Sequence, residues 1–289
     1  MIGHKTREER NTPEIQRSDL AEVVLLLHSL GIREAATFDW LDKPDTQAVE
    51  RAERLLIMLG ALHDAELTSI GRQMLRLPMH PRYSRMLIEA SQRGCVPDAA
   101  LCAALVSGRD LLTRQDREGE REMFEESGDS DFITLMRAYD FAQANRFSFD
   151  RCRSHGINAQ VARQVEQTYQ QILQAARQQR LYDRDAPPAS PAKNDDALLR
   201  CLMSGFIDQL AKRREPGKPA CDLTEQRQGQ LVRESVVQDA PFFVAANLRQ
   251  APSRGPMPLT LLSLATAIKP DWIAGMFPQH LTTTVEHLF

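Results

Sequence analysis

The stretch "ALHDAELTSIGRQMLRLPMHPRYSRMLIEA", residues 61–90, contains the turn and capping residues that decide how the chain folds. It starts with a short strand expected at Ala61–His63 and a turn, after which Thr68 can cap a helix that ends before Pro78. Pro81 then stands in the first turn of another helix, where proline is tolerated because the amide has no intrahelical partner. A small strand element and a helix are thus followed directly by a separate helical region.

Two amphipathic helices are predicted before this stretch. Apolar residues of the first, at helical spacing, are Leu20, Val23, Val24, Leu27 and Leu30. Those of the second, which starts near Thr46, are Val49, Ala52, Leu56 and Leu59. Ser18 can cap the first helix, and Gly31 and Gly60 can end the two. Three short helices with a small strand element are typical of a winged-helix module, which we place at residues 14–79.

A helical bundle is predicted over residues 80–184. Its helices begin at Pro81 and Pro97, with Gly94 between them, and then cover residues 131–145 and 158–180. The segment 108–131 has no periodicity and carries 4 Lys or Arg against 9 Asp or Glu, a net of −5. It therefore predicts a mobile acidic loop.

The pattern changes from helical to strand-like in the last hundred residues. Residues 184–196 contain prolines and small residues that predict a linker, and a helix is expected over 197–211. The β-like runs that follow are 220–224, 229–237, 242–250 and 258–268. Short strands at this spacing suit a barrel of the OB type, so residues 185–289 are predicted to form a linker helix and an OB-like domain. The fold class is mainly α with a C-terminal β-barrel.

Common enzyme motifs are absent from the sequence. It has no GxxxxGK[ST], GxGxxG, HExxH or GxSxG pattern, and no two of its histidines and cysteines have metal-ligand spacing. We therefore assign no catalytic and no metal residue. The 5 cysteines form no CxxC pair, which favours reduced thiols in a cytoplasm. No apolar run approaches the roughly 20 residues that cross a bilayer.

Charge is distributed unevenly, although the net charge is only −3. Residues 14–79 carry 7 Lys or Arg against 11 Asp or Glu, a net charge of −4. An acidic module is poorly suited to bind nucleic acid, which disfavours a winged-helix transcription factor. Residues 132–184 carry 8 arginines against 4 acids, a net of +4. The candidate nucleic-acid contacts are therefore sought in the helical region.

Polar residues form a stripe on one face of the predicted helix 158–180. They are Arg163, Gln167, Gln170, Gln174 and Arg177. Such a stripe can follow a nucleic-acid backbone, and it can equally be a solvated helix face. A basic cluster precedes this helix and could bind phosphate or pair with acids of the 108–131 loop; it contains Arg146, Arg151, Arg153, His155 and Asn158. Lys212, Arg213 and Arg214 could form a basic hairpin for single strands, or be exposed turn charges.

Several blocks of the chain resemble, in order, the C-terminal region of DEAH-box helicases, with bacterial HrpB-like helicases as the nearest likeness. They are "TPEIQRSDLAEVVLLLHSLGI", "RLLIMLGAL", "LTSIGRQMLRLPMHPRYSRMLIEA", "FITLMRAYDFAQANRFSFDRCRSHGINAQVARQV", "RESVVQDAPFFVAANLRQ" and "LLSLATAIKPDWIAGMFP". The resemblance covers nearly all of residues 12–289. It departs from the family pattern at Ser263, where many relatives carry arginine.

This resemblance implies a winged helix, a ratchet-like helical domain and an OB-like domain that hold single-stranded nucleic acid, with RNA as the expected class. Residues 1–13 are then a remnant or linker from a missing RecA-like motor. ATP and Mg²⁺ would act in that motor, and this chain alone would be inactive. The alternative is a protein-interaction or regulatory platform that docks a partner through the acidic winged helix.

Overall fold

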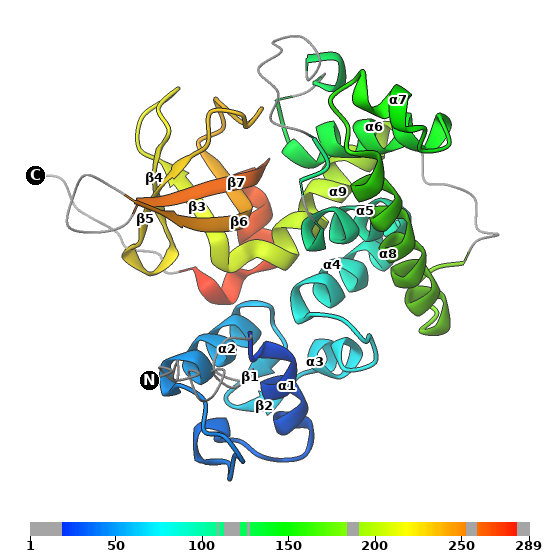
Figure 1. Ribbon diagram of the computed structural model, residues 1–289. Helices are drawn as coiled ribbons and strands as arrows, with labels where there is room; N and C mark the ends of the chain where they lie inside the picture. The colour runs from blue at the N-terminus through cyan, green and yellow to red at the C-terminus, as the bar shows by residue number, and fades with distance from the viewer. Residues whose placement is uncertain are drawn as a thin grey trace, which may run out of the picture. The chain divides into compact units, whose positions relative to one another are not determined.

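The computed structural model describes residues 19–108, 110–112, 122–125, 128–183, 191–252 and 259–281. The chain divides into two compact units, Met1–Pro81 and Arg82–Phe289. Figure 1 shows the helices and hairpin of the first unit, and the helical bundle and barrel of the second. The predicted linker at 1–13 and the cap Ser18 lie outside the described residues.

The first unit has the element order expected of a winged helix. Its elements are α1 (Ala21–Ser29), α2 (Thr46–Met58), β1 (Leu62–His63), β2 (Glu66–Leu67) and α3 (Ser69–Met74), with a short 3₁₀ turn at Ala35–Thr37. The two strands pair antiparallel across Asp64 and Ala65, whose φ angles of 49° and 59° make the tight turn. Thr68 caps α3 by accepting a hydrogen bond from the Gly71 amide at 3.0 Å, as predicted.

The buried face of α1 differs in part from the predicted one. Leu20, Val24 and Leu27 are buried, but Val23 and Leu30 are 39% and 69% exposed. Their places in the core are taken by other residues of the helix, namely Ala21, Leu25 and His28. The helix is apolar almost all round, so its spacing could not show which side faces the core.

The bundle of the second unit contains the predicted helices and one short helix that was not predicted. Its elements are α4 (Pro81–Arg93), α5 (Val96–Ser107), α6 (Asp131–Ala144), α7 (Phe149–Arg153), α8 (Ala159–Gln178) and α9 (Pro191–Phe206). The unpredicted helix is α7, which has only 5 residues. The linker prediction was too long, because α9 already begins at Pro191; proline suits the first turn of a helix.

The predicted acidic loop 108–131 is described only in part. Residues 109, 113–121 and 126–127 lie outside the described residues. Of the rest, Leu111 accepts a hydrogen bond from the Asn158 amide at 2.9 Å. Phe124 is 4% exposed and its ring lies 5.9 Å from that of Phe141. These described parts are therefore attached to the bundle.

The barrel is closed and has five strands. They are β3 (Leu210–Arg213), β4 (Ala220–Leu223), β5 (Gln228–Leu231), β6 (Phe242–Ala251) and β7 (Leu259–Ala267), in the order β3-β4-β5-β7-β6. All pairs are antiparallel except β5 with β7. Sequence reasoning assigned residues 210–211 to a helix and residues 232–237 to a strand, and both assignments were wrong. The helix α10 (Pro270–Met276) follows the barrel.

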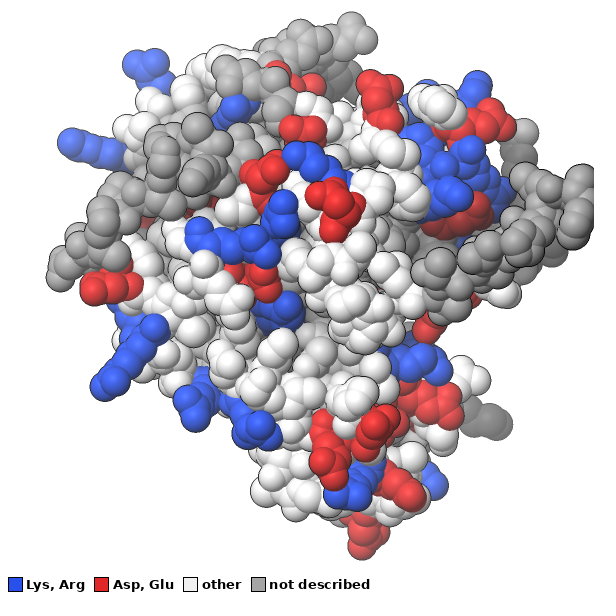
Figure 2. Space-filling model, turned by 180° about the vertical axis from the view of Figure 1, so that it is seen from behind, with Lys and Arg blue, Asp and Glu red and all other residues white. Residues whose placement is uncertain are grey.

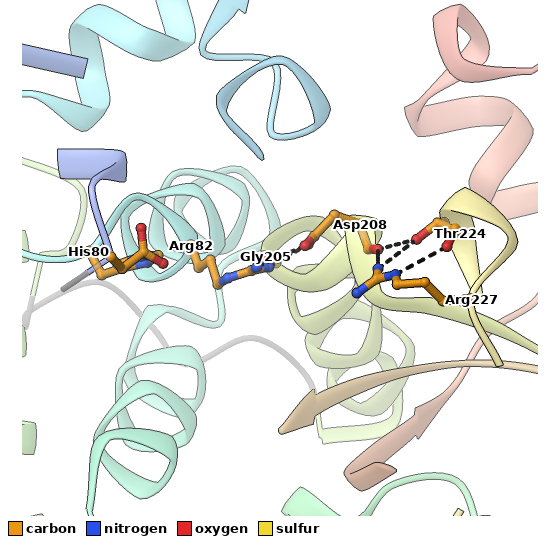
Figure 3. Close-up of polar contacts among 7 residues, drawn as sticks. His80, Arg82, Gly205, Asp208, Thr224 and Arg227 are labelled. Atoms are coloured by element: carbon orange, nitrogen blue, oxygen red, sulfur yellow. Dashed lines mark hydrogen bonds and ion pairs between the residues drawn. The ribbon is translucent and has the colours of Figure 1, made fainter. Parts of the chain in front are cut away.

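A network around Arg82 joins the bundle to the barrel. Its guanidinium, from α4, donates to both carboxylate oxygens of Asp208 and to the Gly205 carbonyl (Figure 3). The Asp208 carbonyl in turn accepts from Thr224 and from Arg227, the first and last residues of the β4–β5 connection. Helix α9 lies between the two parts, in contact with α5 on one side and with β6 and β7 on the other (Figure 1).

Replacing Gly205 with Ala should lower the free energy of unfolding of this unit by about 1–3 kcal/mol. A Cβ there would lie 2.5 Å from Met86 Cγ and 2.9 Å from the Arg82 carbonyl oxygen, so α4 and α9 would have to separate. Urea denaturation followed by circular dichroism measures the change. Gly275→Ala is the matched control, because a Cβ at Gly275 meets nothing within 4 Å. Equal destabilisation of the two variants would contradict this account of the α4–α9 contact.

The cysteines and histidines form no chemical centre among the described residues. All five cysteines are buried and free, and no three His, Cys, Asp or Glu side chains lie together as a metal site needs. Burial raises the pKa of the Cys102 thiol, which keeps it protonated and unreactive. None of the described helices is long and apolar enough to cross a membrane.

Candidate nucleic-acid interface

The basic cluster predicted before α8 lies on the α6–α7 turn and on α7. Arg146 is exposed and has φ 53°, and Arg151 and Arg153 are exposed in the last turn of α7. Asn158 is the N-cap of α8, where its side-chain oxygen accepts from two backbone amides at 3.1 and 3.2 Å. The three arginines are therefore available to a ligand, whereas the oxygen of Asn158 is occupied by the helix.

The polar stripe of α8 is exposed along the helix. All five of its members are solvent-exposed, and the opposite face is buried through Val161, Val165, Ile172 and Ala176. Arg163 also donates to the Phe147 carbonyl at 2.9 Å, and Arg177 lies 5.5 Å from the Tyr182 ring. The two arginines are 14 residues apart, which is about 21 Å along an α-helix.

One acidic side chain lies beside this stripe. Glu166 accepts hydrogen bonds from Gln170, at 3.1 Å, and from the Tyr139 hydroxyl. Burial and the bond to Glu166 raise the pKa of Tyr139, so its hydroxyl stays a proton donor. Burial raises the pKa of Tyr169 to about 12. The stripe is thus basic at its ends and holds a hydrogen-bonded carboxylate between them.

The three basic residues of the predicted hairpin have different environments. The hairpin itself is present, because β3 and β4 pair antiparallel with Arg213 opposite Cys221. Lys212 is exposed. Arg214 is exposed and pairs with Asp222 at 2.6 Å, and that carboxylate raises the pKa of Arg214.

Arg213 is 5% exposed and is bound within the barrel. Its guanidinium donates to three backbone carbonyls, those of Ala240 at 3.1 Å, Val237 at 2.7 Å and Lys218 at 2.5 Å. It also lies 5.5 Å from the centre of the Phe243 ring. We therefore give Arg213 a structural role and keep Lys212 and Arg214 as candidate contacts.

A second joint between bundle and barrel is made by the start of α6. The Asp131 carboxylate accepts from the Ser235 hydroxyl at 3.0 Å and from the amides of Val236 and Ala265 at 2.8 Å each. Next to it, the Ser130 hydroxyl lies 2.8 Å from the Thr266 hydroxyl. Asp131 is 5% exposed, so a buried charge is balanced here by hydrogen bonds from the barrel.

This joint coincides with an irregularity in β6 and β7. The buried core contains Ala245 and Ala265, which face each other across the two strands. Three residues further along, Leu262 of β7 is also in the core, and its partner Leu248 of β6 is partly buried and packs against it. Side chains of a regular strand alternate between its two faces, so residues on the same face are separated by an even number of positions. A separation of three means that the alternation shifts by one residue between these two pairs. Leu264 lies at that point with φ 55°, a left-handed conformation that is strained for leucine.

This shift in the alternation of β6 and β7 turns polar side chains outward. A period of two continued from Phe243 and Ala245 would bury Asn247 and Arg249 in the barrel. Because Leu248 and Leu262 form the inward-facing pair, the flanking pairs Asn247–Ser263 and Arg249–Leu261 face outward together. Both pairs line a cavity of about 500 Å³ between the barrel and the ends of α5 and α6, which we call the junction cavity.

Sequence reasoning did not find the junction cavity. The signal available was the alternation of Asn247 and Arg249 in "FFVAANLRQ", which a strand would place on one face. Ser263, noted only as a departure from the family pattern, lies on the same wall.

On the face drawn in Figure 2, basic side chains stand mostly apart, with a denser group over the barrel.

Comparisons with known proteins identify two domains. The family described as "Helicase associated domain (HA2), winged-helix" matches residues 52–79, and the one described as "Helicase associated domain (HA2), ratchet-like" matches residues 80–135. The predicted winged helix and ratchet-like bundle are thereby confirmed as helicase-associated domains.

Two curated proteins are similar to the chain over much of its length. The pre-mRNA-splicing factor ATP-dependent RNA helicase prp22 of Schizosaccharomyces pombe is 33% identical over 208 residues, which cover 70% of this chain and 17% of that protein. The ATP-dependent RNA helicase HrpA of Escherichia coli is 26% identical over 303 residues, which cover 96% of this chain and 22% of that protein. The chain thus spans about a fifth of the length of these relatives.

Proposed function

The chain carries the C-terminal accessory region of a DEAH-box helicase, and on that premise we propose that it holds single-stranded nucleic acid, with RNA as the expected class, against RecA-like motor domains. The names of both relatives describe ATP-dependent RNA helicases, which supports RNA as the ligand. Hydrolysis of ATP with Mg²⁺ is assigned to the motor, so this chain alone should not turn over ATP. A cytoplasmic location remains a prediction.

The observation that supports strand binding most directly is the exposed stripe of α8 with the basic turn before it. Arg146, Arg151 and Arg153 present cations at one end, and Arg177 presents another near the far end. Exposed guanidinium groups bind phosphate oxygens with charge-assisted hydrogen bonds, and the glutamines between them can add neutral ones. Such contacts position a strand without reading its sequence.

Replacing Arg163 and Arg177 together with Gln should weaken binding of single-stranded RNA and reduce the slope of log K against log salt by about 1–2 units. Each lost phosphate contact on a single strand accounts for roughly 0.7 of a unit. The helix should persist, because Gln is nearly as good a helix former as Arg. Fluorescence anisotropy of a labelled oligonucleotide at several salt concentrations gives both quantities.

The matched control is the pair Arg51→Gln and Arg76→Gln, two exposed arginines of the winged-helix unit. It removes the same charge from the acidic unit and should leave affinity and slope nearly unchanged. If the α8 pair behaves like this control while circular dichroism stays intact, the stripe is only a solvated face and the proposed track along α8 is wrong.

A second candidate function is docking of a protein partner through the acidic winged helix. The observation that favours it is an exposed apolar row on α1, where Val23, Leu26 and Leu30 are 39%, 51% and 69% exposed at helical spacing. Docking on an apolar face should depend little on salt, whereas strand binding should weaken steeply with it. The salt series therefore separates the two functions.

A further inference from the structure

The junction cavity has two walls of different chemistry. Its apolar wall is built by leucines of both parts, among them Leu105, Leu111, Leu135, Leu231 and Leu264. Its polar wall is the outward face of β6 and β7, with the cross-strand pairs Asn247–Ser263 and Arg249–Leu261. A volume of about 500 Å³ lies in the range of sites that hold small organic groups.

The polar groups of this wall are free to bind a ligand. Among the described residues, the side chains of Asn247, Ser263 and Arg249 have no hydrogen-bond or ion-pair partner. The joint at Asp131 and the left-handed Leu264 hold this stretch of sheet in place. An amide, a hydroxyl and a guanidinium thus stand opposite apolar side chains on a fixed surface, an arrangement that suits a flat group with a polar edge.

The charges in the cavity limit the ligand further. Arg233 and Arg249 supply two positive charges. Three acidic residues line the same cavity, namely Asp110, Glu234 and Asp131, and the Asp131 carboxylate is already hydrogen-bonded to the barrel. A nucleoside triphosphate carries several negative charges and would meet no net positive field here. A nucleobase is uncharged, and its single linking phosphate needs only one of the arginines.

We propose that the junction cavity receives one nucleobase of the bound single strand, turned away from the path of the backbone. This proposal rests on the proposed function. The leucines pack against the faces of the base, Asn247 and Ser263 hydrogen-bond to its edge, and Arg249 contacts the adjoining phosphate. The chain therefore prefers strands with bases over strands of equal charge without them, and Asn247 and Ser263 determine which edge is accepted.

The test compares an oligouridylate RNA with an abasic oligomer of the same length and phosphate number, both measured by fluorescence anisotropy. The intact chain should bind the RNA roughly tenfold more tightly, because one base is removed from water against apolar side chains and hydrogen-bonded at its edge. Ser263→Leu and Asn247→Leu fill the cavity and should remove this preference while leaving affinity for the abasic oligomer unchanged. Gln250→Leu is the matched control, because Gln250 is exposed on the same strand and does not line the cavity.

Ser263→Ala adds no bulk and should fold normally, so it provides a second variant. Loss of one hydrogen bond to the base should reduce the preference about fivefold. If the abasic oligomer binds with a steep salt slope and the RNA binds no more tightly, or if the cavity variants keep the full preference, the base site is wrong and strand binding stands. If neither oligomer binds the intact chain, the proposed function fails, and the base site fails with it.

Discussion

Replacing Asp131 with Ala should lower the free energy of unfolding of the larger unit by about 3–5 kcal/mol, because a buried amide, a partly buried amide and a buried hydroxyl lose their acceptor together. The amides belong to Val236 and Ala265, in different parts of the barrel, and each donates to the carboxylate at 2.8 Å. A buried donor without an acceptor costs about 1–3 kcal/mol. Solvent water does not reach this position to replace the carboxylate as an acceptor, because Asp131 is only 5% exposed.

The matched control for this substitution is Asp129→Ala. The Asp129 side chain is exposed, and the residue contributes to the joint only through its backbone carbonyl, which accepts from the Ala267 amide at 2.7 Å. Urea denaturation measures the stability of both variants, and hydrogen exchange at the Val236 and Ala265 amides shows whether the joint opens. Equal stability of the two variants, with both amides still protected, would show that Asp131 does not hold bundle and barrel together.

The Asp131 joint also has a consequence for the cavity. Ala265, which donates to Asp131, follows the left-handed Leu264, where the inward-facing set of β7 changes. Loss of the carboxylate should relax this stretch toward regular alternation and move Ser263 away from the cavity. The preference for strands with bases should therefore fall in Asp131→Ala even under conditions where the variant is fully folded.

Elements with strong local signals could be predicted from the sequence. The second helix of the winged helix has its predicted apolar positions buried, and Gly60 ends it with φ 74°. The predicted turn after the first short strand and the Thr68 cap are also confirmed. Caps, turn residues and helical periodicity act within a few residues, so they are readable without tertiary context. Strand β3 lacked such a signal, because its four residues follow a helix without a proline or glycine between them.

The candidate site was less predictable because its geometry depends on contacts distant in sequence. The outward turn of Asn247 and Arg249 coincides with the Asp131 joint, whose hydrogen bond to the Ala265 amide links residues 134 positions apart. The stripe of α8 was readable, since exposure follows helical spacing there. Whether Lys212 or Arg213 faces solvent depends on the register of β3, a strand that the sequence did not predict.

Replacing Arg213 with Ala should destabilise the barrel by about 3–5 kcal/mol, although a basic run suggested a role in binding. Three backbone carbonyls, of Ala240, Lys218 and Val237, would lose their donor, and the ring of Phe243 would lose the guanidinium beside it. Arg213→Lys should recover only part of this stability, because a single ammonium group cannot direct hydrogen bonds to carbonyls on separate sides as a planar guanidinium does.

Lys212→Ala is the control next to it in sequence, because successive residues of a strand face opposite sides and Lys212 is exposed. It should leave the free energy of unfolding within about 0.5 kcal/mol of that of the intact chain and reduce only the salt slope of strand binding. Arg213→Ala should show the opposite pattern, with a large loss in the free energy of unfolding. Its salt slope for strand binding, measured under conditions where the variant is folded, should be unchanged. A stable Arg213→Ala variant with a reduced slope would restore Arg213 to the nucleic-acid interface, and the structural role assigned to it would be wrong.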